Sequence, residues 1–267
     1  MTQDDIKKEI QQDRRGFIKK VLGGTIAGSL LLVIPATARE IIAEEIPGMR
    51  SEESVFTKKR FAFVVDITAC IGCGSCCIAD KAEYDVPDGY YRTWVERYII
   101  DDQDKVYVDS PDGGLGGYTK PREGLPNPTR DTFFVPKLCN MCEKPSCTQV
   151  CPVGATYKTE DGFVLVDKTR CVGCSYCVQA CPYSVRFINP KTHTAEKCTW
   201  CYHRVRKGLL PACVSVCPVG ARKFGDLNDN TSEVWKILHE PHVISVLKPD
   251  MGNNPALHYI GLRREVV

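Results

Sequence analysis

The sequence has no excess of charge of either sign and no apolar run long enough to cross a bilayer. Its 35 Lys and Arg residues balance 33 Asp and Glu residues to a formal charge of +2, which argues against the large basic surface that nucleic acid binding requires. The longest apolar stretch, residues 21–34, has 14 residues, whereas a spanning helix needs about 20. We also find no Ser–His–Asp arrangement, phosphate loop or paired carboxylates, so nothing in the sequence indicates a small-substrate site.

The first 38 residues are expected to be an export signal and not part of the fold. The pair Arg14-Arg15 in DRRGFIKK resembles a twin-arginine motif. The short apolar stretch follows, and then residues 36–38 (ATA) form a small-residue cleavage site. An uncleaved amphipathic anchor is the alternative. Twin-arginine export carries folded proteins, which suits a chain that receives a cofactor before it crosses the membrane.

Cysteine is abundant, with 16 in 267 residues. The cysteines form four groups: Cys70, Cys73 and Cys76 with Asp80; Cys139, Cys142, Cys147 and Cys151; Cys171, Cys174, Cys177 and Cys181; and Cys198, Cys201, Cys213 and Cys217. The third group has the C-x2-C-x2-C-x3-C-P spacing of bacterial ferredoxins. Three thiolates on one short loop reach different irons of one cluster, and the fourth reaches the neighbouring cluster.

Two other uses of these cysteines have to be weighed. Disulfides persist in exported proteins, and the even number would let all sixteen pair, but scaffolds of that density are usually much shorter chains. Zinc ribbons also use C-x2-C pairs, but they take four ligands from two pairs and have no use for the third and fourth cysteines of each group. The spacing therefore favours iron–sulfur clusters.

The chain contains two superimposed internal repeats. PSCTQVCPVGA, which begins at Pro145, recurs from Pro211 as PACVSVCPVGA. CIGCGSCCIAD, which begins at Cys70, recurs from Cys171 as CVGCSYCVQAC. Such a pattern indicates duplication of a unit that is itself two-fold, and it organises a cofactor array better than a single active site.

The predicted organisation is a charged linker at 39–57, a double ferredoxin-like iron–sulfur body at 58–225 with a Gly- and Pro-rich surface insertion at 101–132, and a C-terminal tail at 226–267. Within the body, FAFVVD (61–66) is predicted to be a strand that leads to the first group, and 156–167 a hairpin. In the tail, a capping box at 230–233 predicts a short helix that Pro241 ends. The rest of the tail is expected to be extended over the body.

The four groups, together with CPVGA, CPYSVRF and KCTWC, resemble the four-cluster iron–sulfur subunits of complex iron–sulfur molybdoenzymes. That family includes the electron-transfer subunits of dimethyl sulfoxide, polysulfide and tetrathionate reductases. A leader of its own makes this chain look more like the DsrO, NrfC and tetrathionate reductase subunits. The likeness spans residues 60–230 and implies an α+β fold of two ferredoxin-like halves, each a 4Fe–4S dicluster unit.

The resemblance also implies how the groups pair around clusters. Site one would use Cys70, Cys73, Cys76 and Cys217; site two, Cys198, Cys201, Cys213 and the fourth position of the first group; site three, Cys139, Cys142, Cys147 and Cys181; site four, Cys151, Cys171, Cys174 and Cys177. The chain departs from the family at site two, because the repeat aligns Asp80 with Cys181. A carboxylate is a harder donor than a thiolate and suits cluster iron less well.

Three outcomes are open at site two: an aspartate-ligated 4Fe–4S cluster, a 3Fe–4S cluster or an empty site, so the chain is expected to hold three or four clusters. Asp80 itself is either a ligand or a solvated surface acid. Cys77 is interpreted as a buried structural thiol, with a replacement ligand as the alternative. Four basic residues that flank the groups would offset cluster charge, with a solvated charge as the alternative: Lys137, Lys144, Arg170 and Lys197.

The expected function is electron transfer, with no catalytic residues in the chain itself. Iron bound by the cysteines would relay electrons between an integral-membrane, quinone-reactive partner of the NrfD type and a molybdopterin subunit or multihaem cytochrome, on the periplasmic side of the cytoplasmic membrane. The insertion and the tail are candidate docking surfaces. The rival hypothesis is a catalytic oxidoreductase that acts alone through an open iron site near Asp80, and a third is a purely structural iron–sulfur protein.

Overall fold

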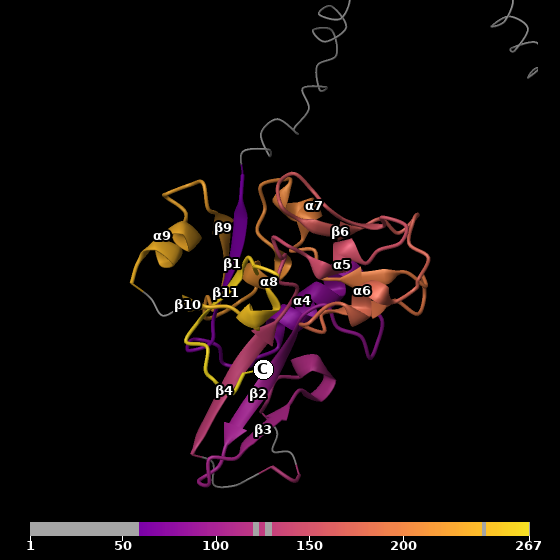
Figure 1. Ribbon diagram of the computed structural model, residues 1–267. Helices are drawn as coiled ribbons and strands as arrows, with labels where there is room; N and C mark the ends of the chain where they lie inside the picture. Colours follow the sequence, from indigo (N-terminus) through magenta and orange to yellow (C-terminus); the bar gives the residue numbers. More distant parts are fainter. Residues whose placement is uncertain (1–58, 120–122, 126–129, 242–243, 267) are drawn as a thin grey trace, which may run out of the picture. The chain divides into compact units, whose positions relative to one another are not determined.

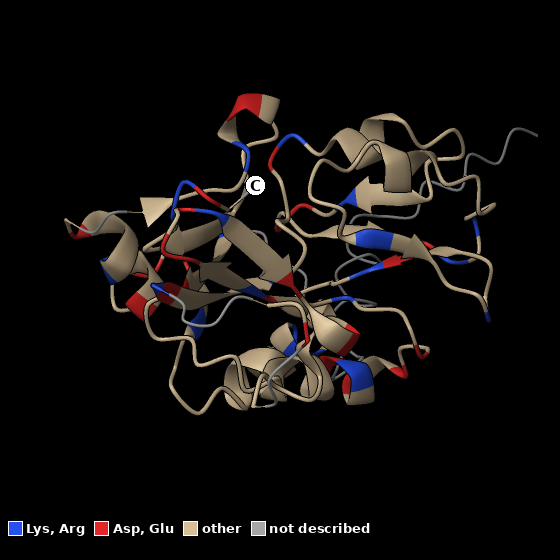
Figure 2. Cartoon of the chain, turned by 90° about the horizontal axis from the view of Figure 1, so that it is seen from below, with Lys and Arg blue, Asp and Glu red and all other residues tan. Residues whose placement is uncertain are grey.

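The computed structural model describes residues 59–119, 123–125, 130–241 and 244–266. The expected leader (1–38) and linker (39–57) lie outside these ranges. The described part is an α+β unit in which short helices alternate with short strands (Figure 1). Acidic and basic residues are interspersed along it (Figure 2), in keeping with the balanced composition.

The core forms around the strand predicted from FAFVVD. This strand, β1 (Phe61–Asp66), lies inside a four-stranded sheet of order β10–β11–β1–β9. β11 (Leu257–Ile260) pairs with it in parallel and β9 (Arg222–Asp226) antiparallel, while β10 (Ile244–Ser245) borders β11. Alternate β1 residues face opposite sides. Ala62 and Val64 pack beneath α9 (Glu233–His239), and the other face of the strand joins the main core.

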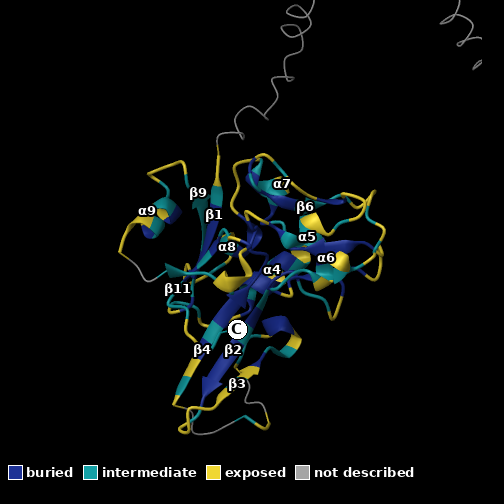
Figure 3. Cartoon of the chain, in the orientation of Figure 1, coloured by how far each residue is buried: buried dark blue, intermediate teal, exposed yellow. Residues whose placement is uncertain are grey.

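The insertion expected as a surface loop contains regular structure. β2 (Trp94–Ile100) is the central strand of a three-stranded antiparallel sheet, between β3 (Val106–Asp109) and β4 (Asp131–Lys137). A 3-10 turn, η1 (Pro111–Gly114), follows β3. Residues along β2 and β4 are largely buried, whereas in β3 Val106 and Val108 are exposed to solvent (Figure 3). Within the predicted surface insertion (101–132), β3 and η1 form regular structure, and most of β3 is exposed.

Each cysteine group is followed by a helix or a hairpin. The helices are α4 (Ser75–Tyr84), α5 (Ser146–Gln149), α6 (Tyr176–Gln179), α7 (Tyr202–Val205) and α8 (Ala212–Ser215). The hairpins pair β5 (Thr156–Lys158) with β6 (Val164–Val166), and β7 (Arg186–Ile188) with β8 (Ala195–Lys197). The hairpin predicted at 156–167 is therefore present. The helices stay short because the chain must turn back at each cysteine pair.

The C-terminal tail is part of the core. The helix predicted there is α9, and its N-cap is Ser232, although the structure gives that side chain no capping hydrogen bond. A 3-10 turn, η2 (Pro249–Met251), precedes β11. Leu257 and Tyr259 are completely buried, and the Tyr259 hydroxyl donates to the Pro136 carbonyl at 3.0 Å. A tail draped over the surface was thus the wrong expectation for β11, which completes the sheet.

Within the described ranges, no helix combines the length and apolar character that crossing a membrane would require.

A substitution of Gly74 tests whether the first cysteine loop depends on close packing against η1. It is the N-cap of α4, with φ +77°, and a Cβ there would overlap the carbonyl oxygen of Gly114 in η1. We expect Gly74→Ala to lower the free energy of unfolding by more than the about 1–2 kcal/mol that a left-handed Cβ costs by itself. Thermal unfolding of the purified protein measures this change. Gly116→Ala is the matched control, because Gly116 lies in open space, and equal effects of the two changes would contradict the assignment.

Candidate iron–sulfur sites

The four C-x-x-C loops share one backbone feature. The residue just before the second cysteine has a positive φ in every loop: Gly72 (66°), Met141 (41°), Gly173 (68°) and Trp200 (52°). Glycine adopts this conformation without strain, whereas Met141 and Trp200 adopt it while buried in the core. The four loops therefore share the same turn of the chain between their two cysteines.

Backbone amides point at several of the sulfurs. The amides of Thr156, Ala195, Trp200 and Ala212 donate to Cys151, Cys171, Cys198 and Cys201, respectively, at 3.3–3.4 Å. Hydrogen bonds of this kind stabilise a thiolate over a thiol. Against burial, they lower the pKa of Cys151, whereas burial outweighs them and raises the pKa of Cys198 and Cys201.

Site one is assembled from both ends of the body. Cys70, Cys73, Cys76 and Cys217 line one pocket, together with Pro218 and Arg222. The Cys77 hydrogen bond and, against the effect of burial, the Arg222 charge lower the pKa of Cys76 to about 6. Cys76 is thus biased toward the thiolate form.

Site three repeats this arrangement. Cys139, Cys142, Cys147 and Cys181 line a second pocket, together with Pro182 and Arg186. Burial, and next the charge of neighbouring Cys139, raise the pKa of Cys142 to about 12. Burial is the larger cause, and the repulsion from neighbouring thiolates that adds to it is relieved when a cation binds between them.

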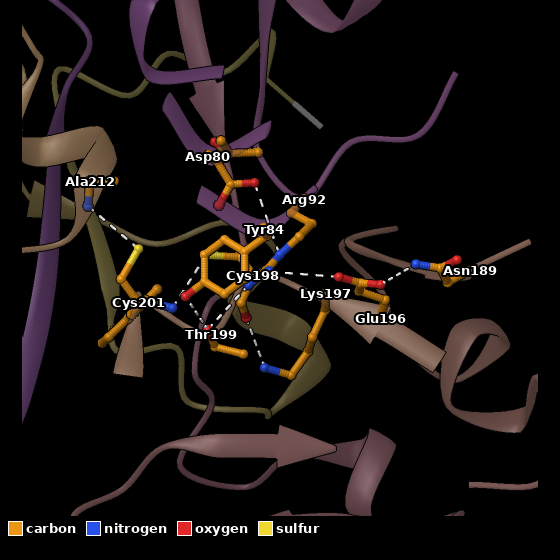
Figure 4. Close-up of polar contacts among 12 residues, drawn as sticks. Asp80, Tyr84, Arg92, Asn189, Glu196, Lys197, Cys198, Thr199, Cys201 and Ala212 are labelled. Atoms are coloured by element: carbon orange, nitrogen blue, oxygen red, sulfur yellow. Dashed lines mark hydrogen bonds and ion pairs between the residues drawn. The ribbon is translucent and has the colours of Figure 1, made fainter. Parts of the chain in front are cut away.

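Site two brings Asp80 next to three cysteines. Asp80 is 4% exposed on α4, and its charge acts on Cys198, Cys201 and Cys213. Arg92 lies beside it, with Nε 4.0 Å from Asp80 Oδ2 and Nη1 3.7 Å from Glu196 Oε1 (Figure 4). Burial raises the pKa of Asp80 to about 6 against the opposing charge of Arg92. The solvated surface acid, one of the two interpretations of Asp80, does not describe this buried residue.

Site four lies where α5 packs against α6. Cys151 follows α5, Cys177 is buried within α6, and Cys174 is exposed in the preceding loop. Cys171 lies in the same loop and accepts the Ala195 amide at 3.3 Å. The structure therefore brings the two segments of this site together through their helices.

Cys77 Sγ lies 3.9 Å from Cys76 Sγ, but Cys77 does not line the pocket of site one. It is 2% exposed, and its thiol donates to the Gly113 carbonyl at 3.4 Å. The neighbouring Cys76 sulfur and burial raise its pKa. These contacts agree with a buried structural thiol.

The donor sets suit iron–sulfur clusters. All sixteen cysteines lie in described residues, and none of them is paired in a disulfide there. Sites one and three each combine three cysteines of one segment with a fourth from far along the chain, the pattern of ferredoxin clusters and not of two-pair zinc sites. The assignment of individual ligands remains a prediction.

Comparison with known proteins agrees with this chemistry. Residues 130–227 match the family model of a 4Fe–4S dicluster domain. The B subunit of tetrathionate reductase from Salmonella typhimurium is 41% identical over 254 residues, which are 95% of this chain and 90% of that protein. The chain belongs to the family of iron–sulfur B subunits of reductases. Such a subunit transfers electrons within a complex and carries several 4Fe–4S clusters.

Other members of the B-subunit family are similarly close. The B subunit of tetrathionate reductase from Archaeoglobus fulgidus is 44% identical and covers 76% of this chain and 83% of its own length. The B subunit of polysulfide reductase from Wolinella succinogenes is 35% identical, with 77% and 96% covered. Because B subunits are components of multi-subunit reductases, this chain has partner subunits.

The four basic residues that flank the cysteine groups in the sequence differ in burial and in partners. Lys144 and Arg170 are exposed, and buried Lys137 pairs with Glu96 at 2.8 Å. Lys197 is 2% exposed and lies among cysteines. Sequence reasoning missed Arg186 and Arg222, although both stand five residues after the cysteine of a Cys-Pro pair, a signal that the internal repeat contains. Arg92 gave no sequence signal.

Asp80 offers a direct test of site two. We expect Asp80→Ala to lower the iron content by about one iron per chain, and Asp80→Cys to give about sixteen irons, because a thiolate completes a fourth cubane. Iron and acid-labile sulfide of anaerobically purified protein measure both. Asp88→Ala, which removes an exposed acid nearby, is the control. Unchanged iron in Asp80→Ala would show that the carboxylate is not a ligand.

Proposed function

We propose that this chain is the exported electron-transfer subunit of a membrane-associated respiratory reductase. It would connect a quinone-reactive membrane subunit with a molybdopterin subunit on the periplasmic side of the membrane. The observation that carries the proposal is the order of the four sites in the body. Clusters bound there would transfer single electrons. The chain holds the four sites in sequence and places one site at each end of the row.

The sites follow one another in a row. Sites one and two meet where α4 packs against α8, and the charges of Cys76 and Cys213 interact there. Sites two and three meet at Trp200, whose indole Nε1 donates to the Cys139 carbonyl at 2.8 Å. Sites three and four share Arg186. Sites one and four are therefore the two ends of the row.

The two end sites carry the exposed cysteines, whereas site two is buried and site three has two half-buried cysteines, Cys147 and Cys181. The exposed cysteines are Cys73 of site one and Cys174 of site four, whereas Cys198, Cys201 and Cys213 of site two are all buried. Exposed apolar residues surround each end: Ile71, Val216 and Val219 at site one, and Val150, Val153, Val172 and Tyr176 at site four. Apolar patches of this kind mark protein contacts. Two such rims suit a subunit that meets one redox partner at each end.

The similarity to B subunits of tetrathionate reductases supports a molybdopterin reductase as the soluble partner. The rival hypothesis of catalysis at an open iron near Asp80 is disfavoured, because that carboxylate is 4% exposed and is enclosed by α4 and Arg92. A substrate would have no route to it without rearrangement of the core.

The two rims give a test of the relay. We expect Ile71→Glu and Val172→Glu each to slow electron exchange with one partner by about tenfold or more, because a charge at a buried apolar contact weakens docking. In membranes that contain the native complex, one variant should lose reduction by quinol, and the other should lose reoxidation by tetrathionate. EPR of the clusters follows both reactions. Val108→Glu on β3 is the exposed control. If both variants behave as the control does, the relay between these ends is refuted.

Export by the twin-arginine route is tested separately. We expect the double change Arg14→Lys and Arg15→Lys to leave the protein in the cytoplasm, because the export machinery recognises the arginine pair. Cell fractionation with an immunoblot measures the distribution. Lys7→Gln with Lys8→Gln alters charge in the same segment and should leave export intact. Periplasmic protein in the arginine variant would contradict the proposed route.

A further inference from the structure

Three cations are buried in the body without an acidic partner. Arg222 and Lys197 are 2% exposed and Arg186 is 5% exposed. Among the described residues, none of the three forms an ion pair with a carboxylate within 4 Å. A buried cation without a counter-charge is strongly unfavourable. The counter-charge must therefore come from the thiolates and whatever they bind.

Arg222 lies between sites one and two. Its pKa is raised, against desolvation, by Cys76 and Cys70 of site one and by Cys213 of site two. Nη2 donates to the Thr93 hydroxyl at 2.9 Å, while Nε and Nη1 are buried with no protein partner. These two donors are free for an anionic group held by the neighbouring thiolates.

Lys197 lies between sites two and three. Its ammonium group donates to the Cys198 carbonyl at 2.9 Å and approaches the Met141 sulfur at 3.9 Å. Burial lowers the pKa of Lys197, and the charge of Arg186 acts in the same direction, whereas the charges of Cys139 and Cys147 of site three and of Cys198 of site two raise it. Figure 4 shows the side chain next to the cysteines of site two.

Arg186 lies between sites three and four. Nη2 donates to the Cys147 sulfur of site three at 3.0 Å, and Nη1 to the Thr156 hydroxyl at 3.3 Å. On the other side, Cys177 of site four acts on the same guanidinium. One buried cation thus separates each pair of neighbouring sites along the whole row.

Arg92 provides the contrast. It is buried to the same extent as Arg222, but it borders site two alone, and the carboxylates of Asp80 and Glu196 neutralise it. The chain thus supplies carboxylates for the one cation that stands beside the row and none for the three that stand between sites.

We propose that Arg222, Lys197 and Arg186 are positioning residues that each raise the reduction potential of the two clusters they separate. The inference rests on the proposed function, since it requires clusters in the row. Thiolate-bound clusters are anionic, and one-electron reduction adds a negative charge. A nearby cation in a low-dielectric interior favours the reduced form and offsets the repulsion between neighbouring reduced clusters. The row then stays reducible from one end to the other.

The test is a redox titration of the purified protein followed by EPR. Lys197→Met removes the charge and keeps the length of the side chain. We expect it to lower the ratio of reduced to oxidised cluster about tenfold at a fixed potential, a shift of 59 mV for a one-electron couple, in every cluster at sites two and three and in none at sites one and four. Arg222→Gln should affect sites one and two, and Arg186→Gln sites three and four.

Matched variants separate charge from packing. Lys197→Arg, Arg222→Lys and Arg186→Lys keep the charge and should restore wild-type potentials. Lys144→Met removes an exposed lysine close to Cys142 and should change nothing, because solvent screens it. Iron content reports whether each variant is loaded, and where a neutral variant loses its iron, the potentials of its charge-keeping partner still test the pattern.

Three results would overturn the inference. The first is wild-type potentials in fully loaded neutral variants. The second is a uniform shift of all clusters, and the third is a shift in Lys144→Met as large as that in Lys197→Met. Absence of iron from the wild-type protein would instead overturn the proposed function itself, so the two failures are distinguishable.

Discussion

The structure depends on burying many negative charges close together in a small body. Four groups of thiolates lie within one α+β unit, and most of their sulfurs are buried or half-buried. Such charges are stable only with cations and hydrogen-bond donors at hand. The fold provides both, through amides that point at cysteine sulfurs and through buried Arg186, Lys197 and Arg222.

The internal duplication explains how one short chain meets this requirement several times. Every C-x-x-C loop has a left-handed residue just before its second cysteine, and the Cys-Pro segments that end in Arg186 and Arg222 each line one pocket. The repeated loops differ in the residue at this position where the loop lies in the hydrophobic core. Met141 and Trp200 replace glycine at the left-handed position, and their buried side chains fill the space between sites two and three.

Site two departs most from the repeated pattern. Its fourth position is Asp80, and Arg92, Glu196 and Asn189 form a polar network next to it, with Asn189 Nδ2 donating to Glu196 Oε2 at 2.6 Å (Figure 4). The network holds the Asp80 carboxylate in place. The residues around this position are therefore arranged for a carboxylate and not for a thiolate. Because net charge and hydrogen bonds set cluster potentials, this site differs in electronic environment from its neighbours.

Cysteine spacing, Cys-Pro pairs and the internal repeats by themselves determined the chemistry, since the reach of a short loop depends only on local sequence. The strand 61–66 and the hairpin at 156–167 were also predictable, because both follow local alternation and turn residues. The pairing of distant groups came from a family resemblance and not from spacing. Tertiary structure alone decided that β11 completes the central sheet, that β3 of the insertion joins β2 and β4 in one sheet, and that Asp80, Arg186 and Arg222 lie between thiols. Those contacts join segments far apart in the chain, where packing of the core, and not local propensity, sets which side chains meet.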